Sequence, residues 1–234
     1  MDSLLVTNLK SLIVFVHLSG LAFGIGGAWI LDLYILRKMH KSPITNENIQ
    51  IITFVSKVVV IGLALLWLSG LSFIVFYNFV QPELLLNHKI WAKAVIVIVL
   101  TMNGYYLHKM VIPVIVNNQN KVLIRAVNLR QVNILTLVGC ISFISWPFAM
   151  FLGTFKSINF TFSFLEIIST YFAVLLFSLA VAFILKSYLM EKEMGRKIRV
   201  LNEHLSNSNE KLFLHQQEIK VLTKVLKKAN HPRM

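Results

Sequence analysis

Residues 17–27 read HLSGLAFGIGG and lie near the start of the first long apolar run of the chain. At 100° per residue, one helix face carries the imidazole and three of the glycines: His17, Gly20, Gly24 and Gly27. Glycine costs about 1 kcal/mol in a helix interior, so glycines gathered on one face need a physical reason. One reason is close packing of a second helix against small residues. The other is a flat cofactor lying in the groove, with His17 as its axial ligand.

The composition of the chain is that of a membrane protein. Of its 234 residues 56% are hydrophobic, and the mean hydropathy is +0.71. A helix needs about 20 apolar residues to cross a bilayer, and five runs are long enough: 8–37, 51–80, 88–116, 130–153 and 162–186. We therefore predict an all-α fold, an integral membrane helical bundle of five transmembrane helices. Residues 1–190 would form this domain, and residues 191–234 a cytoplasmic tail.

The formal net charge of +13 predicts the orientation of the spans. Basic residues gather in the first loop, around the third loop and in the tail, for example Arg37, Lys38 and Lys121. By the positive-inside rule these segments are cytoplasmic, so the N-terminus is outside and the C-terminus inside. We expect a multi-pass protein of the bacterial inner (plasma) membrane. Topology and attraction to anionic lipids then account for the charge, and nucleic-acid binding is not expected. The single Cys140 excludes a disulfide framework.

A heptad pattern follows the fifth run. Apolar residues recur at alternating steps of three and four, which is typical of a coiled-coil seam. The apolar seam positions after Met194 are Ile198, Leu201, Leu205, Leu212, Ile219, Leu222 and Leu226. The remaining d positions are Ser208 and His215, which could set register or oligomer number. We predict a homo-oligomer formed through this coiled coil; the alternative is an amphipathic helix lying on the inner leaflet.

Ionisable residues inside predicted spans are functional candidates, because each costs about 3 kcal/mol when unpaired. Depth along the helices sorts them into two groups. The outer group is His17, His88, Lys93 and Glu166, and the inner group is Asp32, Lys57 and His108. For the inner group we predict an intramembrane ion pair between Asp32 and Lys57, with His108 beside it.

The outer group suggests a b-type haem. Two histidines at one depth on different helices can each supply an axial bond, and the small residues Gly20 and Gly24 would admit the ring. Depth favours His88 as the partner of His17. The pair of His17 and His108 would need strongly tilted helices or a third span that starts lower.

Two further arrangements of these residues are open. Lys93 could serve as an axial amine or as the partner of a haem propionate. Zinc or copper bound by His17, His88 and Glu166 is an alternative. No HExxH, CxxC or phosphate-cradling loop is present, which disfavours a metalloprotease or a nucleotide-dependent enzyme.

Three motifs resemble a family of small bacterial five-span membrane proteins without an established activity. The first is HxxGxxxGxGGAxxxDxxxxR, residues 17–37, in the first span. The second is AK…LTxNGxxLH…P, residues 92–113, in the third. The third is SWxxAxxLG, residues 145–153, in the fourth. The resemblance covers residues 4–183 and implies the five-helix architecture; the tail is additional.

A weaker similarity is to the membrane-bound, haem-binding protoporphyrinogen oxidase family. His17, Arg37, Lys93 and His108 occupy positions comparable to that family's conspicuous residues. This similarity implies haem b as the cofactor and names His108, beside His88, as the second ligand. The same similarity implies that His17 and His108 are the ligands of the haem iron.

Two functions from different classes follow from these patterns. The first is a haem-b membrane protein that acts in electron transfer or in redox or ligand sensing. The alternative is an oligomeric membrane module without haem, for signalling or pore formation, whose coiled coil couples the spans to a cytoplasmic partner. A proton- or ion-coupled transporter that uses Asp32, Lys57 and His108 is a third class, although the chain lacks the inverted repeats and broken helices expected of transporters.

Overall fold

The computed structural model of the chain describes residues 3–229, without the side chains of residues 3, 39–41, 193 and 224–229. Within this range the structure is helical and contains no strand, apart from an isolated β-bridge between Pro43 and Val122. Five helices are long and apolar enough to span a membrane: Leu4–Lys38, Asn46–Val80, His88–Asn117, Leu129–Thr154 and Phe164–Thr223. The prediction of an all-α chain with five membrane-length helices is confirmed; its orientation in a membrane stays a prediction.

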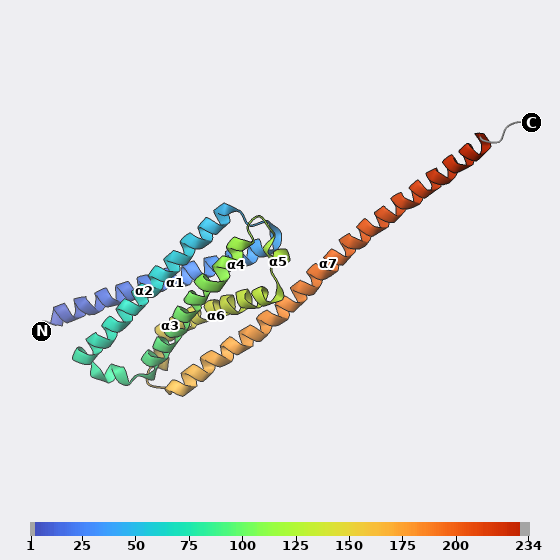
Figure 1. Cartoon of the computed structure of the whole chain (residues 1–234). Helices are drawn as coiled ribbons and strands as arrows, with labels where there is room; N and C mark the ends of the chain where they lie inside the picture. The colour runs from blue at the N-terminus through green and yellow to red at the C-terminus, as the bar shows by residue number, and fades with distance from the viewer. Residues whose placement is uncertain (1–2, 230–234) are drawn as a thin grey trace, which may run out of the picture. The chain divides into compact units, whose positions relative to one another are not determined.

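The chain divides into two compact units, Met1–Phe183 and Ile184–Met234. The helices follow in the order α1 (Ser3–Lys41), α2 (Asn46–Val80), η1 (Pro82–Leu86), α3 (His88–Tyr106), η2 (Leu107–Val111), α4 (Ile112–Asn117), α5 (Leu123–Ala126), α6 (Leu129–Thr154), η3 (Lys156–Ile158) and α7 (Phe164–Ala229). In the first unit α1 packs along α2, and α6 packs against both α1 and α3 (Figure 1).

Local capping fixes where α2 and α6 begin. The side chain of Thr45 accepts a bond from Asn48 N, and the Asn48 side chain accepts one from Thr45 N, which is a capping box. Asn48 Nδ2 also donates to Tyr34 Oη at 2.9 Å and thereby links α2 to α1. Asn128 and Gln131 form the same reciprocal cap at α6.

The third span runs through Pro113 and ends at Asn117, one residue beyond the predicted run of 88–116. A π-helical turn, η2, precedes the proline, and α4 then continues to Asn117. Proline lacks the N–H that an α-helix would use at this point. The wider turn brings Ile112 N to the carbonyl of Leu107, so the backbone pairs one residue further back. This turn holds His108, one of the predicted site residues.

The segment between the third and fourth spans is packed into the protein, although basic residues gather around it. Its residues Leu123 and Ile124 are buried, and α5 forms there. Ile44 N donates to Lys121 O, and Asn120 N donates to Ile44 O, so the first and third loops pair. Both loops, predicted to be on the same side of the membrane, therefore lie together.

Trp146 and Tyr171 lie at the centre of the core of the first unit. Trp146 is 2% exposed and Tyr171 is fully buried, and they cluster with Ala92, Ile96 and Leu152. Ser145 Oγ lies 2.8 Å from Tyr171 Oη and donates its own proton to Ile141 O. The tyrosine is therefore the donor in this bond.

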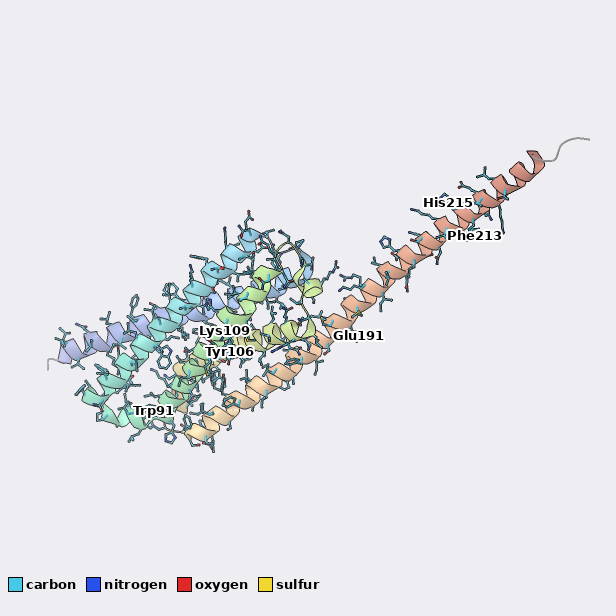
Figure 2. All side chains as sticks on the ribbon, viewed as in Figure 1. Trp91, Tyr106, Lys109, Glu191, Phe213 and His215 are labelled. Carbon is cyan, nitrogen blue, oxygen red and sulfur yellow. The ribbon has the colours of Figure 1, made fainter. Side chains whose placement is uncertain are left out.

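The second unit is helical to Ala229, and its predicted seam is solvent-exposed in the single chain. Ile198, Leu201, Leu205, Leu212, Ile219 and Leu222 are all exposed; the side chain of Leu226 lies outside the described residues. His215 lies at a predicted seam position on α7 (Figure 2). It pairs with Glu218 on the same helix. The coiled coil stays a prediction.

Candidate functional site

The glycine face of α1 is filled by neighbouring helices. A Cβ on Gly62 of α2 would lie 2.5 Å from Gly24 N and 2.8 Å from Gly20 O, so the two backbones are in direct contact. Gly24 also faces the ring of Trp146 from α6, and Gly27 faces Val59. Helix packing accounts for the three glycines of α1, Gly20, Gly24 and Gly27. In this structure Gly62 and Trp146 cover the part of this face at Gly20 and Gly24.

His17 is held by a hydrogen-bond chain between α1 and α2. Its Nδ1 lies 2.9 Å from Ser69 Oγ, and Ser69 donates its hydroxyl proton to Leu65 O at 2.6 Å. Since the serine proton is used, His17 Nδ1–H is the donor and Nε2 carries the lone pair. The ring of Phe73 meets the imidazole edge-on at 5.6 Å between centroids. Lys93 is the charged side chain that acts electrostatically on His17.

The three predicted haem histidines take three different positions. His88 is exposed at the start of α3, and its Nδ1 accepts a bond from Phe164 N at 2.9 Å, which caps α7. His108 lies 20 residues later, about 30 Å along the helix. It lines a cavity together with Asp32, which is about 22 Å along α1 from His17.

The structure places His108 beside Asp32, away from His17, and engages His88 Nδ1 at the start of α7; haem b stays a prediction. The zinc or copper alternative is not formed. The described residues contain no group of three or more His, Cys, Asp or Glu side chains placed to hold a metal ion. Glu166 instead accepts bonds from Ser163 N and Oγ at the start of α7.

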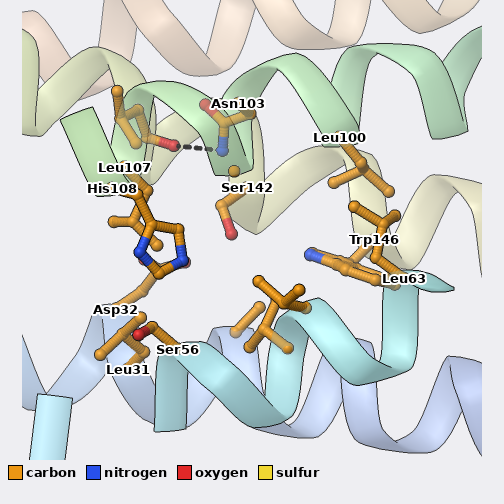
Figure 3. A pocket seen from close by; sticks show the side chains of 15 residues that line it. Leu31, Asp32, Ser56, Leu63, Leu100, Asn103, Leu107, His108, Ser142 and Trp146 are labelled. Carbon is orange, nitrogen blue, oxygen red and sulfur yellow. Dashed lines mark hydrogen bonds between the residues drawn. The ribbon is translucent and has the colours of Figure 1, made fainter. Parts of the chain in front are cut away.

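A small, mostly apolar cavity that also holds several polar side chains lies between α1, α2, α3 with η2, and α6 (Figure 3). Its volume is about 30 Å³, which is room for about two water molecules. The polar side chains that line it come from all four helices: Asp32, Ser56, Asn103, His108 and Ser142. Leu63, Leu100 and Trp146 contribute apolar walls. The cavity is the place where the inner group of predicted residues partly comes together.

Asp32 is an ionisable side chain of the cavity lining that is only partly paired. Its Oδ2 is buried and has no hydrogen-bond partner among the described residues. The hydroxyl of Ser142 interacts with the carboxyl group. The side chain of Asn103 bonds to another helix: its Nδ2 donates to Val138 O of α6 at 3.1 Å (Figure 3). Ser56 donates to Thr53 O at 2.9 Å.

The structure does not bring Asp32 and Lys57 together. Lys57 is exposed. Ser56, which precedes Lys57 in the chain, is fully buried and lines the cavity together with Asp32. Adjacent residues of a helix point about 100° apart, so the lysine is directed away from the cavity. His108 does lie beside Asp32 in the cavity lining and is also exposed, which places it at the cavity's edge.

Serines were the functional residues that pattern reasoning missed. Ser56, Ser69 and Ser142 are all buried, and each contacts or faces one of the predicted ionisable side chains. Their signal in the sequence is weak, because a serine in a span is as compatible with close helix packing as with a polar site. Ser69 could have been linked to Gly62 and Leu66, since these residues share a helix face.

Comparisons with known proteins add no assignment: no family model, curated protein or solved structure matches this chain. The function must therefore be argued from the chemistry of the cavity and of the residues around His17.

Proposed function

We propose that this chain is an integral membrane protein that binds and releases a proton at Asp32, inside its five-helix domain. The observation that carries the proposal is the buried, unpartnered Oδ2 of Asp32 beside a cavity of about 30 Å³. An ionised carboxylate is costly to bury without a cation. Among the described residues no lysine or arginine lines this cavity, so proton uptake is the available way to neutralise the charge.

The cavity also offers a proton route. His108 lines it and is exposed, so the imidazole connects the interior with the surroundings. An imidazole both accepts and donates protons near neutral pH, and water in the cavity could bridge it to the carboxyl group. Chains of Asp and His within membrane domains are typical of proton relays. The π-helical turn that holds His108 is of a kind often found at functional sites.

Infrared difference spectroscopy tests the proposal directly. Spectra of the full-length protein in lipid at acid and alkaline pH should contain the carbonyl stretch of a buried protonated carboxyl group. Asp32→Asn should remove this band, whereas the matched control Lys57→Met should keep it, because Lys57 is exposed and does not line the cavity. His108→Ala should keep the band but slow its appearance after a pH jump. A band that persists in Asp32→Asn would refute the proposal.

Oligomerisation through the tail is the second part of the proposed function. The support is the exposed apolar seam of residues 198–222 on a continuous helix, since an apolar stripe of this spacing pairs with a copy of itself in coiled coils. We expect the full chain in detergent to have the mass of an oligomer and a chain truncated after residue 190 to lose it. An unchanged mass on truncation would contradict this role.

Haem binding is the other candidate function, favoured by one contact. A histidine whose Nδ1–H is held by a hydrogen bond leaves Nε2 available to a metal, and Ser69 holds the Nδ1–H of His17 in this way. Protein expressed with ample haem should then show a Soret band that His17→Ala abolishes. The absence of a Soret band would remove this candidate without affecting the proton proposal.

A further inference from the structure

Two buried serines line the same cavity as the carboxyl group of Asp32. Ser56 is fully buried and Ser142 is 8% exposed; Figure 3 shows both beside the cavity. Their hydroxyl protons are already used, because Ser56 donates to Thr53 O at 2.9 Å and the Ser142 hydroxyl is bonded to the carboxyl group. Lone pairs of both hydroxyl oxygens therefore remain available near the unpartnered Oδ2 of Asp32.

These three side chains bring oxygen atoms from three different helices to one enclosed space. Asp32 belongs to α1, Ser56 to α2 and Ser142 to α6. Oxygen ligands that include a carboxylate suit hard cations. A buried carboxylate is stable when it is paired or when it coordinates a metal ion. A hard cation from outside the chain is therefore a second way, besides a proton, to neutralise this group.

Charge and size restrict the kind of cation. Asp32 is the only acidic side chain among the described residues that line the cavity. A single positive charge matches it, whereas a divalent ion would leave a positive charge without a counter-ion in a mostly apolar space. The volume of about 30 Å³ gives room for about two water molecules, and thus for one small ion with one water molecule.

We propose that Asp32, Ser56 and Ser142 form a binding site for a small monovalent metal cation, Na⁺. The ion loses part of its hydration shell and gains the carboxylate and the two hydroxyl oxygens, and no covalent bond changes. The inference rests on the proposed function in one respect, because both require the carboxyl group of Asp32 to face the cavity. A bound ion would tie α1, α2 and α6 together and stabilise the folded protein.

Thermal unfolding of the full-length protein in a non-ionic detergent tests the site. NaCl is compared with choline chloride at the same concentration and pH, which keeps the ionic strength equal. A ligand that binds only the folded state raises the melting temperature. We expect NaCl to raise the Tm of the wild type and of the control Lys57→Met by several degrees above choline chloride. Asp32→Asn should have the same Tm in both salts.

Two further measurements keep the proposal testable if Asp32→Asn does not fold. Ser56→Ala removes one ligand oxygen and keeps the carboxyl group, so it should need about tenfold more Na⁺ for half of the Tm rise. Scintillation proximity with ²²Na⁺ needs only the wild type, which should bind the ion saturably. Unlabelled NaCl should displace the bound ion, and choline chloride should not.

Equal Tm values of the wild type in the two salts, an unchanged Na⁺ response in Asp32→Asn or Ser56→Ala, or no saturable ²²Na⁺ binding would overturn the proposal. The infrared band of the protonated carboxyl group reports on the proton site separately. If Asp32→Asn removes this band but the wild type binds no ²²Na⁺, the cation site fails and the proposed proton function stands. If ²²Na⁺ binds but the band persists in Asp32→Asn, the proton function fails and the cation site stands.

Discussion

Replacing Gly62 by alanine should separate the α1–α2 pair, because the three atoms nearest to the new methyl group all belong to backbone. The Cβ would lie 2.5 Å from Gly24 N, 2.8 Å from Gly20 O and 2.9 Å from Gly24 Cα. Ordinary contact begins near 3.4 Å. The two helices must therefore move apart by about 0.9 Å, since no side chain can rotate out of the way.

The matched control for Gly62→Ala is Gly70→Ala on the same helix, where the new methyl group would meet no atom within 4 Å. Both substitutions gain the same helix propensity, about 1 kcal/mol relative to glycine. The difference in their free energies of unfolding therefore isolates the packing cost, for which overpacking in a close-packed interior gives about 1–3 kcal/mol. We expect Gly62→Ala to be the less stable variant by that amount.

Equilibrium unfolding in mixed micelles of mild detergent and dodecyl sulfate, followed by helicity and by tryptophan fluorescence, measures this difference. Trp146, which lies against Gly24, is one of the four tryptophans that contribute to the fluorescence change. If Gly62→Ala and Gly70→Ala unfold at the same dodecyl sulfate fraction, the backbone contact between α1 and α2 described above is incorrect.

Two further contacts give separate predictions. Lys89→Met removes both bonds to the loop after α6 and should speed hydrogen exchange in residues 155–159, measured by mass spectrometry; exchange as slow as in Lys57→Met would count against this anchoring role. Tyr171→Phe should cost about 0.5–1.5 kcal/mol of unfolding free energy, because Ser145 keeps its bond to Ile141 O. Ser145→Ala should cost about 1–3 kcal/mol of unfolding free energy, since it leaves the buried hydroxyl of Tyr171 without an acceptor. If unfolding titrations show that Tyr171→Phe is the more costly substitution, the assignment of Tyr171 as the donor is refuted.

Hydropathy and local motifs were sufficient for the helices of the membrane domain. The predicted third span began at His88, where α3 begins, and the predicted fourth span differed from α6 by one residue at each end. Such boundaries can be predicted from nearby sequence, because capping side chains such as Asn87 and Asn128 act within three residues of the helix start. The turn at η2 was not predictable, because the effect of Pro113 depended on whether the backbone could pair one residue further back.

Depth along each helix was also readable from the sequence, and it placed Asp32 and His108 in one group. Depth does not specify rotation or neighbours, however. Asp32 was expected to face Lys57, but the packing of α2 turns Ser56 toward the cavity. Ser56 and Lys57 are adjacent, so a small rotation of α2 decides which of them faces the cavity. Because Ser56 faces it, Asp32 meets a hydroxyl group and not a cation, and its carboxyl group is left without an ion-pair partner.

The glycine face of α1 illustrates the same division most clearly. Its spacing alone established that one side of the first span has almost no side chains, and therefore that something flat or close must lie against it. Only the tertiary structure decided what that is: the backbone of α2 at Gly62 and the ring of Trp146 from α6. Both lie far from Gly24 in the chain, and contacts between distant segments depend on how all the helices pack together, which periodicity within one helix does not encode.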